Sequence, residues 1–182
     1  REAPRPPGDF LAYHFDAGRF ATLLSRHAHG LGVHHLKGLL SDVALDETGA
    51  IDHVVSAEHG RLEADLYIDC TGFRAELIGK AMKVPFKAID HILFTDRAVT
   101  CQVPYPKADT PLESYTISTA HEAGWTWDIG LPSRRGVGYV YSSRHSSAER
   151  AEEVLRAYIA RGPWDGQDFA TRRIQFEAGY RT

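Results

Sequence analysis

Two helical segments enclose a long stretch of strand patterning, and this order constrains the fold more than any other feature of the sequence. The first helix is predicted at 17–29, directly after Asp16, whose carboxylate can accept a backbone N–H of the first turn. The second is predicted at 147–161, where Ser146 and Glu149 have the spacing of a capping box. We therefore expect an α+β fold rich in antiparallel strands.

The segments with strand character are separated by turn residues. Asp46 to Gly49 forms one such turn, and the run 62–70 ends at another, Thr71-Gly72. Because the end of that run is mostly apolar, it is typical of a strand covered on both faces. A short helix is expected at 75–82. The predicted strands are 36–45, 51–57, 62–70, 93–103, 114–119, 124–131, 135–143 and 171–178.

The composition excludes several classes of function. The chain has 182 residues, of which 43% are apolar and 25% charged, and its formal net charge is −3. This balance is typical of a globular domain and offers no basic surface for nucleic acid. No apolar run approaches the ~18 residues that a membrane span requires. Cys70 and Cys101 lie on predicted apolar strands, where we expect both to be buried in a reduced, cytoplasmic protein.

Other constellations have simple structural explanations. His27 and His29 lie about 200° apart on a helix, and no carboxylate or cysteine completes a ligand set, so we predict no metal site. The segment Gly136-Val137-Gly138 is not followed directly by a helix, so it indicates a strand with small residues and not a phosphate loop. The serines at 142–147 form no nucleophile elbow.

Two tryptophans fall within one short strand segment. If 124–131 is a strand, Trp125, Trp127 and Ile129 share one face and form an apolar wall. Core packing is the commoner use of tryptophan, whereas such a wall can also line a cofactor or aromatic-substrate pocket. The pattern alone leaves both uses open.

A second segment, ADLYIDCTGFR at 64–74, ends a predicted strand in Thr71-Gly72. Glycine removes the Cβ that would clash with a closely approaching backbone, as happens beside dinucleotide pyrophosphates. A strand–turn–helix junction without any ligand explains the same residues.

Taken together, these segments resemble the flavin-dependent halogenases of the tryptophan halogenase family, from Ala12 to Arg181. The most specific likeness is WTWDIG at 125–130, which is similar to the W-x-W-x-I-P signature of that family. Gly130 replaces the proline, a departure that bears on the local backbone and the substrate subgroup more than on the family. The other similar segments are YHFDA at 13–17, ADLYIDCTGFR at 64–74, DRAV at 96–99, Val103-Pro104, YTISTA at 115–120 and GYVYSS at 138–143.

Other anchors of the family are missing from this sequence. It has no G-x-G-x-x-G loop for the FAD pyrophosphate, and the family's substrate-side glutamate and halide-binding turn would come after Thr182. The sequence therefore looks like an internal piece of a halogenase that is inactive alone, and we assign no catalytic residue. The lysines that do not match the context of the family's catalytic lysine are Lys37, Lys80, Lys83, Lys87 and Lys107.

The resemblance implies an enzyme that uses reduced FAD, molecular oxygen and a halide ion to halogenate tryptophan, indole or a related aromatic substrate. It implies that Thr71 and Gly72 bind the cofactor and, more weakly, that Leu40 contacts the adenine through its backbone. Trp125 and Trp127 would be substrate-binding residues that form a rigid wall beside the flavin.

The resemblance also implies an organisation and a set of partners. Residues 12–82 would be a partial FAD-binding region of the flavin monooxygenase or halogenase type, and residues 83–182 an antiparallel sheet on the substrate side. A separate flavin reductase and a second copy of the full-length protein are the expected partners. Two alternatives are an FAD-dependent aromatic monooxygenase that hydroxylates its substrate and a binding module without catalytic activity, because one fold supports different functions.

Overall fold

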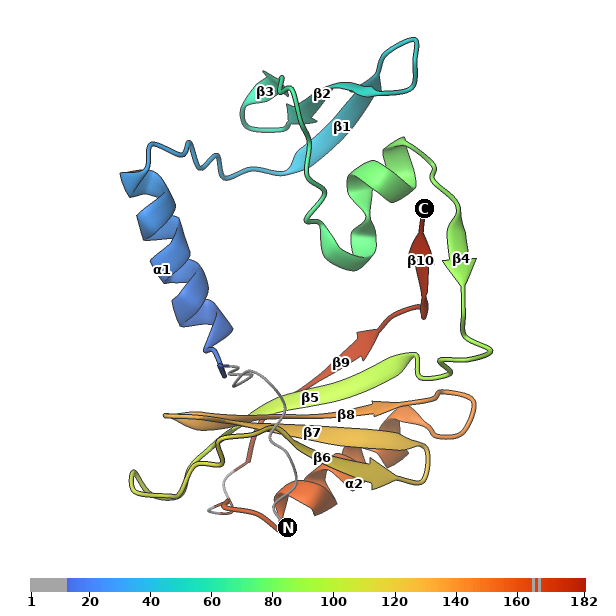
Figure 1. Ribbon diagram of the computed structural model, residues 1–182. Coiled ribbons are helices and arrows are strands. Elements are labelled where there is room, and N and C mark those ends of the chain that lie inside the picture. Colours follow the sequence, from blue (N-terminus) through green and yellow to red (C-terminus); the bar gives the residue numbers. More distant parts are fainter. Residues whose placement is uncertain (1–12, 165, 167) are drawn as a thin grey trace, which may run out of the picture.

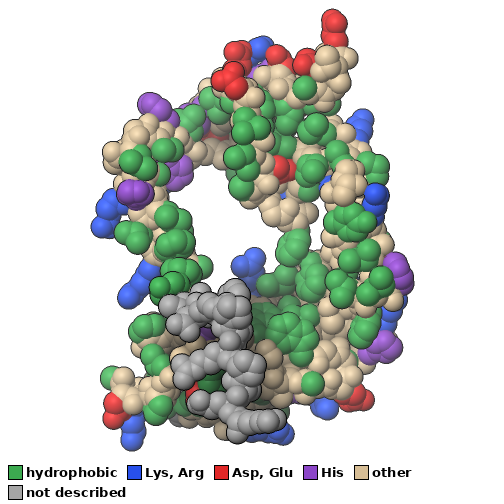
Figure 2. Space-filling view, in the orientation of Figure 1, with side chains coloured by type: hydrophobic (Ala, Val, Ile, Leu, Met, Phe, Trp, Pro, Cys, Tyr) green, Lys and Arg blue, Asp and Glu red, His purple; other side chains and the backbone are tan. Residues whose placement is uncertain are grey.

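The computed structural model describes residues 13–164, 166 and 168–182, whose elements form an open ring (Figure 1). In the space-filling view the ring surrounds an opening (Figure 2). The first part of the ring contains α1 (Ala17–Gly30), β1 (Leu40–Leu45), β2 (Ile51–Ser56), β3 (Gly60–Leu62), a 3-10 turn (Gly72–Arg74), a π-helical turn (Glu76–Ala81) and β4 (Phe86–Ala88). The remainder contains β5 (Arg97–Pro104), β6 (Ile117–His121), β7 (Gly124–Leu131), β8 (Arg134–Tyr141), α2 (Ala148–Ile159), β9 (Thr171–Gln175) and β10 (Gly179–Arg181).

The largest sheet is antiparallel and has the strand order β6-β7-β8-β5-β9. Helix α2 covers one of its faces, and the opposite face turns toward the opening (Figure 1). A single hydrophobic core therefore lies between this sheet and α2. Its buried members are Val99, Cys101, Val103, Val137, Tyr139, Tyr141, Ala151, Leu155, Ile159 and Phe169.

Helix α2 forms because its apolar residues recur at every fourth position. Ala151, Leu155 and Ile159 share one face and are fully buried against the sheet. The predicted helix is confirmed, but its cap lies one residue later than expected, since the Ser147 hydroxyl accepts the backbone N–H of Arg150 at 3.1 Å. The third helical position is then an arginine, so the reciprocal glutamate bond of a capping box does not form.

Helix α1 begins as predicted. The Asp16 carboxylate accepts the backbone N–H of Arg19 at 3.1 Å, and the Phe15 and Phe20 rings stack with their centroids 4.6 Å apart, as in a hydrophobic staple. A second bond fixes this helix start to the large sheet, because Asp16 also pairs with Arg134. None of the residues of α1 is buried, and its apolar side chains lie beside the opening (Figures 1 and 2).

The prediction of a strand at 62–70 is wrong for every residue except the first. β3 ends at Leu62, and the following residues have no strand structure, with Leu66 and Ile68 each 75% exposed. A strand needs neighbours that accept its hydrogen bonds, and within the described chain no strand pairs with this segment. Cys70, which we expected to be buried, is consequently exposed, whereas Cys101 is buried as expected.

The other predicted strands are present, although several have different ends. The first begins at Leu40, four residues later than expected, and the strand predicted from 93 begins at Arg97. The last one stops at Gln175, after which β10 pairs with β4 in a separate two-stranded sheet. In the described part of the chain, no helix combines the length and apolar content needed to cross a bilayer.

The packing of the core can be tested through the free energy of unfolding. Replacing Leu155 with alanine should lower the free energy of unfolding by about 2–5 kcal/mol, because it leaves a cavity between α2 and the sheet. Leu66→Ala is the matched control: that leucine is 75% exposed, so its truncation should change stability by less than about 0.5 kcal/mol. Urea titrations would check both, and similar losses for the two variants would contradict this description of the core.

Candidate functional site

Trp125 and Trp127 lie on the face of the large sheet that α2 leaves uncovered. Side chains alternate along β7, so Thr126 and Asp128 point toward α2 and are buried, at 0% and 5% exposure. Trp125 is 41% exposed, and the two indole centroids are 6.1 Å apart with the ring planes inclined by 59°. The predicted shared face is therefore confirmed, and we call this pair the aromatic wall.

Asp69 organises the corner formed by Thr71 and Gly72. One carboxylate oxygen accepts the Thr71 hydroxyl at 2.6 Å and its backbone N–H at 3.1 Å. The other accepts the backbone N–H groups of Leu77 and Ile78, each at 2.9 Å, and so satisfies donors at the start of the π-helical turn. Gly72 has a φ of 65°, a left-handed conformation that glycine adopts without strain.

The charge of Asp69 is held by these contacts. Burial raises the pKa of the carboxyl, but the hydrogen bonds from Thr71, Ile78 and Leu77 outweigh this effect and lower the pKa to about 2. The carboxylate is therefore ionised throughout the physiological range. The sequence analysis missed this residue, although an aspartate two positions before a threonine is a common way to stabilise a turn.

The predicted cofactor and substrate residues border the same opening from different sides. The aromatic wall lies on the large sheet, whereas Thr71-Gly72 and the start of β1 lie on the other side of the ring (Figure 1). Leu40, at that start, is 39% exposed on an edge strand. Among the described residues no hydrogen bond or ring contact joins the corner to the wall. The structure thus places the predicted residues around one space but does not bring them into contact.

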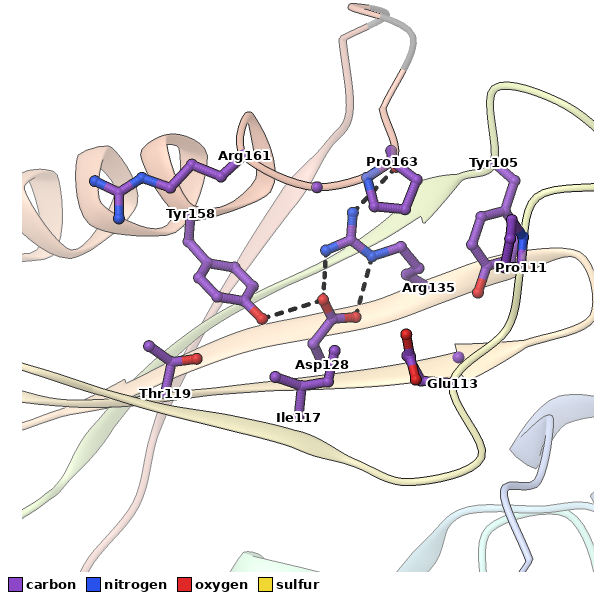
Figure 3. Close-up of a pocket in the computed structure, with 12 residues that line it drawn as sticks. Tyr105, Pro111, Glu113, Ile117, Thr119, Asp128, Arg135, Tyr158, Arg161 and Pro163 are labelled. Atoms are coloured by element: carbon purple, nitrogen blue, oxygen red, sulfur yellow. Dashed lines mark hydrogen bonds and ion pairs between the residues drawn. The ribbon is translucent and has the colours of Figure 1, made fainter.

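A buried ion pair lies behind the aromatic wall, on the α2 side of the sheet (Figure 3). Arg135 donates its Nε hydrogen to Asp128 at 3.1 Å, donates a second bond from Nη2, and reaches the carbonyl oxygen of Pro163 with Nη1 at 3.1 Å. The Tyr158 hydroxyl of α2 donates to the same carboxylate at 3.2 Å. Both charged side chains are almost fully buried, with 5–6% exposure.

The pair adjoins a cavity of about 250 Å³ that is also bordered by Tyr105, Glu113 and Gly130. Burial lowers the pKa of Arg135, but its bonds to Asp128 raise it above the ordinary value, so the guanidinium stays charged. Burial, with Asp128 beside it, also raises the pKa of Tyr158. These groups are bonded to one another, so we interpret the cluster as a support for β7 and β8. A carboxylate on the buried face of a strand was the signal that the sequence analysis overlooked.

The segment before α1 contacts the end of β7, the strand that carries the wall. His14 lies with its Nδ1 atom 3.2 Å from the Gly130 carbonyl oxygen and its Nε2 atom 3.3 Å from the Thr116 hydroxyl. Together with the Asp16–Arg134 pair, these contacts join the start of α1 to the β7–β8 hairpin. Asp16 caps the helix as expected, and His14 joins the segment before the helix to the large sheet. Within the described residues, no group of three His, Cys, Asp or Glu side chains is arranged to hold a metal ion.

Comparison with known proteins identifies the family. A family model described as tryptophan halogenase matches residues 9–182. The 7-chloro-L-tryptophan 6-halogenase KtzR of Kutzneria sp. (strain 744) is 45% identical over 148 residues, which are 81% of this chain and 29% of that protein. The tryptophan 7-halogenase RebH of Lentzea aerocolonigenes is 38% identical over 169 residues, or 92% and 31% of the two chains. The crystal structure of the tryptophan 6-halogenase SttH from Streptomyces toxytricini matches with a TM-score of 0.86 and 40% identity, over 92% of this chain and 32% of that one.

The chain belongs to the tryptophan halogenase family. Its α+β fold, rich in antiparallel strands as predicted, matches part of the solved structures of flavin-dependent halogenases. The chain spans about a third of the length of the curated relatives it matches. The likeness covers nearly all of this chain but only one portion of each relative.

The corner predicts a pH-dependent effect on stability. Because the folded-state pKa of Asp69 is below the usual carboxyl value, its contribution is complete above about pH 4 and disappears as the pH falls through about 2. Asp69→Asn should therefore lower the free energy of unfolding by about 1–3 kcal/mol at pH 7 and by much less near pH 2. Denaturant titrations across this range would measure it. The exposed neighbour Asp65 provides the control, and an Asp69→Asn effect that is constant with pH would contradict the assignment.

The buried ion pair predicts an asymmetry between single and double variants. Asp128→Asn should cost about 3–5 kcal/mol of stability, because it leaves the Arg135 charge buried without its partner. Replacing both residues, as Asp128→Leu with Arg135→Met, should cost less than the single change, since no isolated charge is then buried. Thermal and urea unfolding would compare them. Equal losses would show that the attraction between the two charges is not what stabilises this region.

Proposed function

We propose that this chain is part of a flavin-dependent halogenase that acts on tryptophan, indole or a related aromatic substrate. The observation that carries the proposal is the family match over residues 9–182, together with relatives whose names specify tryptophan 6- and 7-halogenation. The exposed ring of Trp125, on the sheet face that α2 leaves uncovered, supports it, because a wall that served only the core would be covered.

The residues around the opening fit contact with FAD. Apart from its two chain neighbours, no described residue has an atom within 4 Å of the point that a Cβ on Gly72 would occupy, so a cofactor could approach this backbone closely. Thr71 and Gly72 would hold the cofactor on this side, and Leu40 would contact its adenine. When bound and reduced, FAD would supply the electrons for the reaction with oxygen. Trp125 and Trp127 would exclude water and restrict the orientation of an aromatic substrate.

We further propose that the two parts of the chain have the separate roles that the family resemblance implies. Residues 12–82 would contribute to FAD binding, and residues 83–182 would contribute the substrate-side sheet. The exposed apolar residues of α1 and of the segment near Ile68 would be covered by other parts of the full-length protein, since such side chains are rarely left in water together. A flavin reductase would supply reduced cofactor, and two full-length copies would form a dimer. The cytoplasmic location stays a prediction.

The proposal is tested with the full reading frame that encodes this chain. The purified product, supplied with FAD, a flavin reductase, oxygen, bromide and tryptophan or indole, should give a brominated ring detectable by mass spectrometry. Omission of bromide separates the two enzyme candidates: a hydroxylated product that forms without halide would identify an aromatic monooxygenase. Bound flavin with neither product would contradict both the halogenase and the monooxygenase.

The aromatic wall predicts a specific loss in that assay. Trp127→Ala should reduce the rate of halogenation by about tenfold or more, which is ~1.4 kcal/mol of lost transition-state stabilisation. Leu45→Ala serves as control, because Leu45 is an exposed apolar residue at the far end of β1 and does not belong to the wall. Product formation per bound flavin would be measured. If both variants lose activity equally, the wall has no particular role.

A further inference from the structure

The two indoles of the aromatic wall have different surroundings on the sheet. Trp127 is paired in register with Gly138 of β8, and Gly138 is paired on its other side with Thr100 of β5. The next residue in this row is Arg172 of β9. The row lies on the face opposite α2, because the residues on either side of Gly138 and of Thr100 in the sequence belong to the core.

The indole of Trp127 lies across Gly138. A Cβ built on Gly138 would be 2.2 Å from Cζ2, 2.3 Å from Cη2 and 2.7 Å from Cε2 of that ring. Real carbon contacts need about 3.5 Å or more, so any side chain here would displace the ring by more than roughly 1 Å. The six-membered half of the indole therefore rests in a place that only glycine leaves free.

Gly136, two residues earlier on the same strand and the same face, lacks this contact. The nearest atom to a Cβ at Gly136 would be the Ile129 carbonyl oxygen, at 4.0 Å. Neither glycine has a positive φ, so both positions accept alanine as far as the backbone is concerned. The two glycines differ mainly in what lies above them, which makes Gly136 a matched control for Gly138.

The ring of Trp127 also borders a shallow hollow of about 540 Å³ above Gly136. Its other lining residues include Thr100, Gln102 and Arg172. The distance by which the indole extends across β8 thus determines how much of the hollow beside these polar residues stays free. Arg172 lines this hollow and forms no ion pair with any described residue.

We propose that Gly138 is the positioning residue of the aromatic wall: by having no side chain, it lets the Trp127 indole extend across β8 and so sets the wall's reach and the size of the adjoining hollow. Residue 138 acts through Trp127 and touches no substrate itself. The consequence for halogenation rests on the proposed function, whereas the geometric statement does not.

The first experiment is a double-mutant cycle in this chain. Gly138→Ala should raise the unfolding equilibrium constant about tenfold, because the ring must leave its seat, whereas Gly136→Ala should have little effect or stabilise. In a Trp127→Ala background the sign should reverse, since alanine is preferred to glycine in a strand once nothing lies above it. A Gly138→Ala loss that persists without the indole would overturn the proposal.

The second experiment reads the position of the ring directly. The Trp125–Trp127 pair is close enough for exciton coupling in circular dichroism, and Gly138→Ala should change that couplet while Gly136→Ala should not. An unchanged couplet in folded Gly138→Ala protein would overturn the proposal. In the full reading frame, a changed couplet with unaltered halogenation kinetics would leave Gly138 as the positioning residue and refute the proposed role of the wall in orienting the substrate.

Discussion

The one-sided covering of the five-stranded sheet is the constraint on which the rest of this structure depends. Helix α2 buries the side chains of one face, so period-two alternation turns the remaining side chains toward the opening. On β7 this alternation places Thr126 and Asp128 in the interior and the two tryptophans outside. A slip of one residue in the β7 register would bury the indoles and expose the carboxylate. The same pairing therefore determines both the stability of the sheet and the orientation of its wall.

Charges on the covered face hold that register in place. Asp128 and Arg135 come from neighbouring strands, and Tyr158 joins them from α2, so one polar cluster connects two strands and a helix. A buried pair of this kind contributes little net stability compared with apolar packing, but it penalises every arrangement that separates the charges. Specificity of register, more than added stability, is the role that its geometry supports. This cluster supports β7 from the covered face, and Gly138 leaves room for the Trp127 indole on the opposite face.

Local signals in the sequence were sufficient for the helices and for the shared face of the tryptophans. The Asp16 cap, the Phe15–Phe20 staple and the fourfold spacing of Ala151, Leu155 and Ile159 act over a few residues, so their outcome depends little on the remainder of the chain. The segment 62–70 failed for the opposite reason. Its apolar pattern describes a strand only when other strands lie beside it, and that information is not local. The prediction that Cys70 is buried was wrong for the same reason.

The candidate site shows the same division between local and distant information. Thr71-Gly72 and Trp125/Trp127 could be selected one segment at a time, yet their placement around a common opening depends on how the ring of elements closes. Asp69 and Asp128 were missed because each works through partners distant in sequence or through backbone donors that a pattern of residue types does not display. Glycine is the extreme case, since its contribution is an absent side chain. Gly136 and Gly138 have the same residue type, strand and face, and only the ring above one of them gives that position a distinct role.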